Sequence, residues 1–298
     1  MTLTANGRGV RAAALAVVPL ALLAVLFAWP LAATIHRAVW GGGIGGAAHV
    51  PPFADVASAL GTTLWLAAAG TVLALAVGLP ATWALYRRPW SGSRLVSTVL
   101  EVPFVLPTVV VALAVLALTR DAVPSLAAAD GMPGIVLALG FFNIAVVLRF
   151  VGPSLEAFDE RQDAAARTLG ASRRRSAWHV VWPQARRAVG NAAAVTFLFC
   201  ASSFALVLLI GGTRVRTLET STYLELTAFA NVQGAAIYAG MHALVVASIA
   251  VAVSRVGRKA SAGRVHEHFR AHRTDAPWIW LMLAPAIAVF LAPMVALV

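Results

Sequence analysis

The segment EAFDERQDAAARTLGASRRRSAWHVVWPQARR, residues Glu156–Arg187, is the longest charge-rich interval of an otherwise apolar chain. It lies between an apolar run that ends at Leu148 and another that begins at Ala188. This position between two apolar runs favours an exposed loop of a membrane protein. Two alternatives remain for its role: a solvated loop without a partner, or an element that docks on another protein.

The composition of this charged segment predicts two short helices separated by a glycine. Asp163–Leu169 contains good helix formers, and Gly170 tolerates the backbone angles that a helix end requires. Ser172 is suited to cap a second helix over Arg173–Val181. Pro183 is expected to close that helix, because the residue before a proline disfavours the helical conformation.

The overall composition excludes a soluble globular domain. The chain has 298 residues, of which 60% are hydrophobic, and its mean hydropathy is +0.82. Its formal charge of +11 is carried by arginines that flank apolar runs, so membrane topology explains it and no nucleic-acid partner is expected. The single cysteine, Cys200, lies inside an apolar run, which leaves no disulfide framework and no cysteine-based metal site. We expect neither a metal nor a cofactor.

Seven apolar runs predict an all-α, polytopic membrane protein, because a run of about 20 apolar residues can span a bilayer as a helix. The runs are Ala12–Ile35, Leu60–Leu85, Leu95–Thr119, Pro133–Leu148 with an extension past Arg149, Ala188–Ile210, Ala235–Val253 and Pro277–Val298. We therefore expect a six-span domain over residues 1–254, a basic linker over 255–276 and a seventh helix over 277–298.

The distribution of basic residues predicts the orientation of these spans. If the N-terminus is inside, 19 of the 23 lysines and arginines lie inside. The four on the outside are Arg37, Arg120, Arg214 and Arg216. Because cytoplasmic loops carry the excess of basic residues, the N-terminus and the charged segment are both expected in the cytoplasm.

Three polar or helix-breaking residues in the third and fourth runs are candidates for a solute pathway. Pro103 and Pro107 predict a kink in the third run, since a proline leaves backbone carbonyls of its helix without partners. Asn143, in the middle of the fourth run, fits either a helix–helix hydrogen bond or a pathway. Glu101 is either an interfacial residue beside Arg94 or a gate residue.

Motifs for enzymatic chemistry are missing from the sequence. The only lysine, Lys259, follows Arg258 instead of the glycine that a phosphate-binding loop requires. Neither a GxSxG serine motif nor a HExxH zinc motif is present. The chain is therefore not expected to be an enzyme, and energy for any active transport has to come from another subunit.

The charged segment resembles the EAA motif of bacterial ABC importer permeases, which reads Glu-Ala-Ala, three residues, Gly, nine residues, Ile, any residue, Leu-Pro. Ala165, Ala166, Gly170 and Pro183 match this pattern, whereas Ala164, Val180 and Trp182 replace Glu, Ile and Leu. In that family the motif forms a coupling helix that sits in a groove of a separate ATPase subunit. The resemblance assigns ATPase coupling to Ala164, Ala165, Ala166, Leu169, Gly170, Ala171 and Pro183, with Asp163 or Glu160 as substitutes for the missing Glu.

Further segments are similar to the thiamine and ferric-iron branch of these permeases. They are Ala84–Arg94, Val102–Leu116, Gly134–Arg149 and Phe197–Gly212. Thiamine permeases are nearer, because they too can lack the motif's Glu and carry Trp-Pro at its end. The resemblance implies a subunit of the bacterial inner membrane that imports thiamine or its phosphate esters, with ferric iron as the competing solute.

The same resemblance implies the partners: a dimer of ATPase subunits, an extracytoplasmic solute-binding protein, and a second permease half or a second copy of this chain. Members of this branch usually fuse two six-helix halves. The run Pro277–Val298 therefore resembles the first helix of a truncated second half. A different class of function also remains open, namely a membrane scaffold or passive channel whose basic loop binds anionic lipid.

Overall fold

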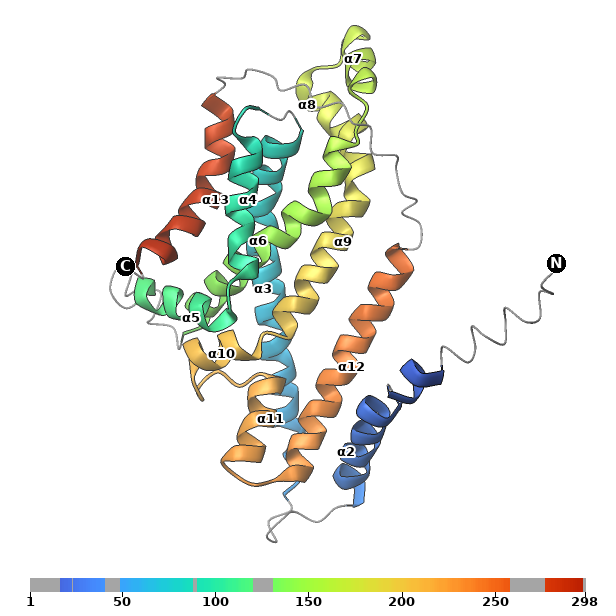
Figure 1. Cartoon of the computed structure of the whole chain (residues 1–298), viewed down its shortest axis with the longest axis vertical. Coiled ribbons are helices and arrows are strands. Elements are labelled where there is room, and N and C mark those ends of the chain that lie inside the picture. Colours follow the sequence, from blue (N-terminus) through green and yellow to red (C-terminus); the bar gives the residue numbers. More distant parts are fainter. Residues whose placement is uncertain are drawn as a thin grey trace, which may run out of the picture.

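Every regular element in the described part of the chain is a helix, which confirms the predicted all-α fold. The computed structural model describes residues 17–22, 24–40, 49–87, 90–119, 131–257 and 277–296. The elements in order are η1 (Ala24–Ala28), α2 (Trp29–Trp40), α3 (Phe53–Tyr86), α4 (Ser93–Val105), α5 (Thr108–Ala117), α6 (Met132–Glu156), α7 (Glu160–Thr168), α8 (Arg173–Ser176), η4 (Ala177–Val181), α9 (Trp182–Ala201), α10 (Phe204–Gly211), α11 (Leu218–Thr227), α12 (Val232–Gly257) and α13 (Pro277–Ala296). They form an elongated bundle with α7 at one end and α11 at the other (Figure 1). We call these two ends the α7 end and the α11 end.

The long helices agree with the predicted spans. Among the described residues, α3, α6, α12 and α13 are each long and apolar enough to cross a membrane. The number rises to six if each of two bent helix pairs forms one span. The first predicted run, Ala12–Ile35, is helical over most of its described length, but its start lies outside the described residues. The predicted linker also lies largely outside them, because α12 continues to Gly257 and the description resumes at Pro277.

Both bent pairs interrupt a predicted span. Helices α4 and α5 meet at an angle of 101°, and the segment that includes α9 meets α10 at 53°. The first break falls at Leu106 and Pro107, where the backbone is extended. Pro107 lacks the N–H that would continue the hydrogen-bond ladder, so the predicted kink occurs at this residue and is sharper than a bend within one helix.

Helices α3 and α6 form the centre of the bundle. A side chain at Gly78 of α3 would bring its Cβ within 2.9 Å of Val147 Cβ on α6. Similarly, a Cβ at Gly140 would lie 2.5 Å from Leu73 Cδ2. Small residues at these positions allow the two helices to pack closely, as is usual in membrane bundles.

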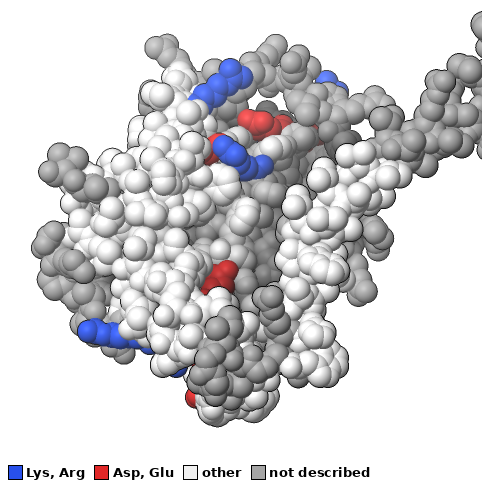
Figure 2. Space-filling view, turned by 60° about the horizontal axis from the view of Figure 1, so that its bottom comes forward, with Lys and Arg blue, Asp and Glu red and all other residues white. Residues whose placement is uncertain are grey.

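Helices α13 and α2 flank this centre on opposite sides (Figure 1). Helix α13 packs against α3, α4 and α5, and buries Ile279, Leu283 and Ala286. Helix α12 contacts α2, and only 11% of the apolar stretch of α12 is buried. Figure 2 shows a face on which uncharged residues predominate and charged side chains are few, as expected for a surface that contacts lipid.

The prediction that Pro183 closes the second helix of the charged segment is wrong. Trp182 adopts helical angles, with φ −57° and ψ −45°, and Pro183 lies in the first turn of α9. A π-helical turn over Ala177–Val181 precedes it. Pro183 has no N–H to continue the helical hydrogen-bond ladder, and the wider π-helical turn directly before it accommodates this gap. The chain therefore continues from α8 into the span α9 without a break.

Candidate functional site

Helix α7 is a separate nine-residue helix whose two ends are defined by local interactions. The Asp159 carboxylate caps its start and accepts a hydrogen bond from the Arg161 backbone N–H at 2.9 Å. Gly170 follows its end with a φ of +87°, a conformation that residues with a Cβ rarely adopt. Ser172 then caps α8 by accepting a hydrogen bond from Arg175 N at 3.3 Å, as the sequence predicted.

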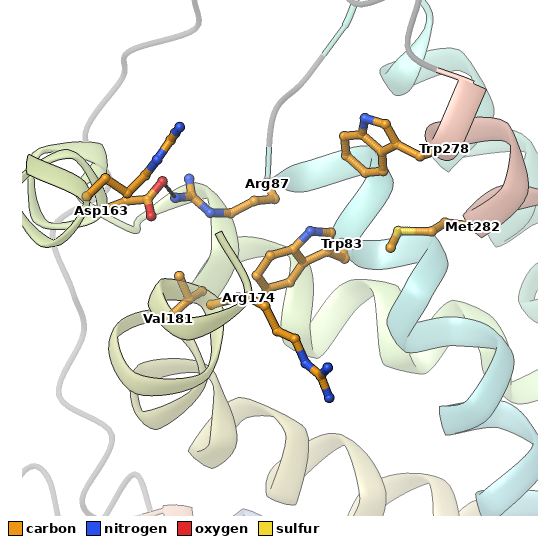
Figure 3. A pocket seen from close by; sticks show the side chains of 9 residues that line it. Trp83, Arg87, Asp163, Arg174, Val181, Trp278 and Met282 are labelled. Carbon is orange, nitrogen blue, oxygen red and sulfur yellow. Dashed lines mark ion pairs between the residues drawn. The ribbon is translucent and has the colours of Figure 1, made fainter. Parts of the chain in front are cut away.

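Three contacts attach α7 to the rest of the protein. The guanidinium of Arg87, at the end of α3, lies 3.5 Å from the Asp163 carboxylate (Figure 3). The Ser176 hydroxyl of α8 also donates a hydrogen bond to Asp163. Gln184 of α9 donates a hydrogen bond of 2.8 Å to Gln162. Helix α7 is therefore linked to two membrane-spanning elements, α3 and α9.

Asp163 faces the protein interior in this arrangement. Only 17% of its side chain is exposed, and Arg87 beside it is 7% exposed. The Arg87 guanidinium also lies 4.4 Å from the centre of the Phe158 ring. Asp163 therefore attaches α7 to α3 and α8 in this structure. The side chain of Glu160, the other substitute considered, lies outside the described residues.

Most of the predicted coupling residues have exposed side chains. Ala164, Ala165, Leu169, Gly170 and Pro183 are exposed, and Ala166 and Ala171 are half-buried. Leu169 is 89% exposed at the tip of the helix turn. An exposed leucine beside a row of alanines gives a small apolar surface with no partner in the described part of the chain.

Two tryptophans of the charged segment form a stacked pair that the sequence analysis did not predict; it considered only Trp182, as the residue that replaces the motif's Leu. Trp178 and Trp182 stack with their ring centres 5.7 Å apart and their planes within 5°. Trp178 is 65% exposed. Their spacing of four residues places them on the same side of a helix, and this was the signal that could have identified them.

The proposed pathway residues occupy different environments. Asn143 is fully buried in α6, donates a hydrogen bond of 2.8 Å to the Leu139 carbonyl, and lies 3.5 Å from the Cys200 sulfur. Its Oδ1 atom has no hydrogen-bond partner among the described residues. Pro103 is buried within α4, whereas Pro107 is exposed at the break before α5.

A charged pair lies beside this break. The Arg149 side chain of α6 donates a hydrogen bond of 2.9 Å to Glu101 of α4. The Arg149 guanidinium also lies 5.4 Å from the centre of the Phe104 ring. The sequence left Glu101 as either an interfacial residue beside Arg94 or a gate residue, and the structure shows Arg149 as a partner of its carboxylate. Both side chains remain partly accessible on the surface of this chain.

Glu219 is a partly buried acidic residue near the α11 end. Glu219 Oε1 lies 3.6 Å from His242 Nε2 of α12. Burial raises the pKa of the Glu219 carboxyl to about 7, because the charged form loses hydration. At this distance the two atoms are not hydrogen-bonded, and His242 Nε2 has no hydrogen-bond partner among the described residues.

Comparison with known proteins places these elements in a family. The family model described as "Binding-protein-dependent transport system inner membrane component" matches residues 70–261, which include α7. The putative 2-aminoethylphosphonate transport permease of Salmonella paratyphi A is 30% identical, over 69% of this chain and 77% of its own length. The molybdate/tungstate transport permease of Thermococcus kodakarensis is 29% identical, over 52% of this chain and 61% of its own.

A thiamine transport permease of Brucella abortus is also 29% identical, over 55% of this chain, and the match spans 33% of that protein. Two solved structures share the fold. The inward-facing MetNI methionine ABC transporter matches with a TM-score of 0.58 and 20% identity, over 70% of this chain and 96% of the other. An amino acid ABC transporter matches with a TM-score of 0.52 and 22% identity, over 70% and 94% of the two chains. The chain therefore belongs to the family of binding-protein-dependent transport system inner membrane components, the permease subunits of ABC importers.

Proposed function

We propose that α7 is the coupling helix of this permease and docks on a separate ATPase subunit. The observation that carries the proposal is the position of the EAA-like residues on an exposed helix turn at the α7 end. An apolar tip around Leu169 and Gly170 suits insertion into a protein groove, where burial of apolar surface favours binding. On this proposal the α7 end is cytoplasmic, in agreement with the charge distribution of the loops.

The contacts of α7 supply a route for transmission to the spans. ATP binding draws two ATPase subunits together, and each moves the coupling helix that it holds. The Arg87–Asp163 pair transmits such a movement to α3, and the Gln162–Gln184 hydrogen bond transmits it to α9. Because both partners are long helices, a displacement at the α7 end changes the packing of the bundle.

The solute pathway is proposed to pass the broken span α4–α5. Asn143, Pro103 and Pro107 remain the proposed pathway residues, and the Glu101–Arg149 pair is added to them. Charged residues within membrane helices usually face a water-filled cavity or another protein surface, because lipid cannot solvate them. The partly accessible Glu101–Arg149 pair therefore favours an orientation of this face toward the pathway or a second permease half.

The solute is proposed to be thiamine or one of its phosphate esters. The resemblance of the charged segment and the similarity to the Brucella thiamine permease support this choice. Relatives of equal identity are named for 2-aminoethylphosphonate and for molybdate or tungstate, so these solutes compete with thiamine and ferric iron. Uptake of each labelled solute by a deletion strain decides among them. Unchanged thiamine uptake in that strain would exclude thiamine as the solute.

The remaining partners follow from the same proposal. A binding protein delivers the solute at the α11 end, and a second half, from another chain or a second copy, completes the pathway. Affinity purification of the tagged chain should recover an ATPase subunit. A Leu169→Asp variant, which places a charge at the apolar tip, should recover less of this ATPase subunit. The control Arg186→Gln, at an exposed position of α9, should recover as much as the wild type. Purification of the wild-type chain without any ATPase would favour the scaffold or channel alternative.

A further inference from the structure

A cavity of about 400 Å³ opens at the α7 end between α3, the α7–η4 region and α13 (Figure 3). Its walls combine basic and apolar side chains. The basic ones are Arg87, Arg167 and Arg174, and the apolar ones include Trp83, Trp278 and Met282. The volume falls within the range of pockets that bind small organic ligands.

The positive charge of the cavity exceeds what its own acidic residue can balance. Asp163 is the carboxylate in the wall, and it is already paired with Arg87 and hydrogen-bonded to Ser176. Arg167 and Arg174 are exposed, and no described carboxylate lies within ion-pair distance of either. Figure 3 shows Arg87 directed at Asp163, whereas the Arg174 side chain extends away from it. Two guanidinium groups are thus available to an anion.

The apolar walls indicate that the anion carries an apolar part. Trp83 lies near the end of α3, and Trp278 lies at the start of α13, so both are placed where helices leave the apolar part of the bundle. Tryptophan at such positions is typical of the membrane–water interface. The cavity therefore combines basic groups with apolar surface at the level where α3 ends and α13 begins.

We propose that this cavity binds the phosphate group of an anionic phospholipid. Arg167 and Arg174 contact the phosphate, for which a guanidinium is a suitable bidentate donor, and the acyl chains follow α3 and α13. Basic pockets between membrane helices are known to hold anionic headgroups. A lipid bound here connects α7 with α13, so the position of α7 depends on the lipid. This role goes beyond solute transport and does not depend on the solute.

The test measures the thermal unfolding of the purified full chain in detergent with a short-chain phosphatidylglycerol or with the matching phosphatidylcholine. We expect phosphatidylglycerol to raise the unfolding temperature more than phosphatidylcholine does. The double variant Arg167→Gln/Arg174→Gln should lose this difference. The control Arg175→Gln/Arg186→Gln removes two exposed arginines of the same segment that do not line the cavity, and it should keep the difference.

Two further arms separate charge from shape and lipid from free phosphate. Met282→Trp fills the cavity without a change of charge, and it should also lose the difference. Glycerol 3-phosphate, which has no acyl chains, should leave the unfolding temperature unchanged at the same concentration. Equal stabilisation by glycerol 3-phosphate would overturn the lipid assignment. The site itself would be overturned if the wild-type chain were stabilised equally by the two lipids. It would also be overturned if both cavity variants kept the difference between the lipids, or if the control lost it to the same extent.

Discussion

At Gly170 the local backbone geometry and the proposed coupling role concern the same residue. Its φ of +87° favours glycine, and a Cβ there would meet no other atom within 4 Å. An alanine therefore adds only the cost of the left-handed conformation, about 1–2 kcal/mol. A bulky side chain adds an obstruction that becomes important only when another protein covers the surface.

Gly170→Arg is accordingly expected to abolish solute uptake while the protein reaches the membrane in normal amounts. Gly170→Ala, the control, carries the same backbone cost and should keep most of the uptake. The measurement is uptake per amount of permease in isolated membranes. Normal uptake by the arginine variant at normal abundance would contradict a docking role for this turn.

Asp163 provides a second test at the residue scale. Asp163→Asn removes the charge that balances the buried Arg87, at an expected cost of about 1–3 kcal/mol. Helix α7 should then be cleaved faster by protease, and uptake should fall. Asp159→Asn is the matched control, because asparagine caps a helix as well as aspartate. Equal behaviour of the two variants would show that the Arg87–Asp163 pair does not hold α7.

The Arg87–Asp163 pair also marks a limit of sequence analysis at this scale. Both residues belong to segments that were described from the sequence, but nothing in either segment indicates that they meet. Asp163 instead appeared as a substitute for the missing Glu of the motif. The pairing depends on how α3 and α7 are placed relative to each other, and local patterns carry no information about such tertiary contacts.

At the scale of elements, the glycine break and the Ser172 cap were predicted, because both depend on residues next to each other in the chain. The start of α7 was placed too late, at Asp163 instead of Glu160, since the capping role of Asp159 was not considered. The error at Pro183 has another cause. The rule for residues before a proline is local, and the π-helical turn η4, which joins α8 to α9, overrides it.

Helix α11 gives a prediction about pH. The folded-state pKa of Glu219, about 7, lies above the usual value of 4.5, so the folded protein binds an extra proton between these values. The stability that this bound proton contributes is therefore lost as the pH rises toward and through 7. Glu219→Gln mimics the protonated form. At pH 8 it should raise the unfolding temperature, with a gain in the free energy of unfolding on the order of 1 kcal/mol. At pH 5 it should have little effect.

Thermal unfolding of both proteins in the same detergent at pH 5 and pH 8 checks this. His242→Gln serves as the control for loss of the contact alone. A Gln variant that is less stable than the wild type at pH 8 would show that the carboxylate is stabilising.

At the scale of the whole molecule, run lengths and hydropathy were sufficient to predict an all-α membrane protein. They do so because the bilayer dictates the length and polarity of each span. They did not predict how sharply α4 bends into α5, or that α13 packs on α3, α4 and α5. These features depend on contacts between spans, which periodicity within one span does not encode.

The orientation of the molecule has a direct test. Ala165→Cys at the α7 end and Arg214→Cys toward the α11 end both replace exposed residues, and the native Cys200 is buried. An impermeant thiol reagent added to sealed cells should label position 214 and spare position 165, because the α7 end is expected inside. Labelling at position 165 alone would show the opposite orientation, with α7 on the side of the membrane that lacks ATP.

The central claim is that an ATPase bound at α7 drives the transport of solute through this permease. The measurement that tests it most directly is solute uptake by proteoliposomes that contain the purified chain with its co-purified subunits. We predict that uptake requires ATP on the α7 side and is lost in Gly170→Arg but kept in Gly170→Ala. Uptake that proceeds equally without ATP, or that is unaffected by the arginine at position 170, would contradict the claim.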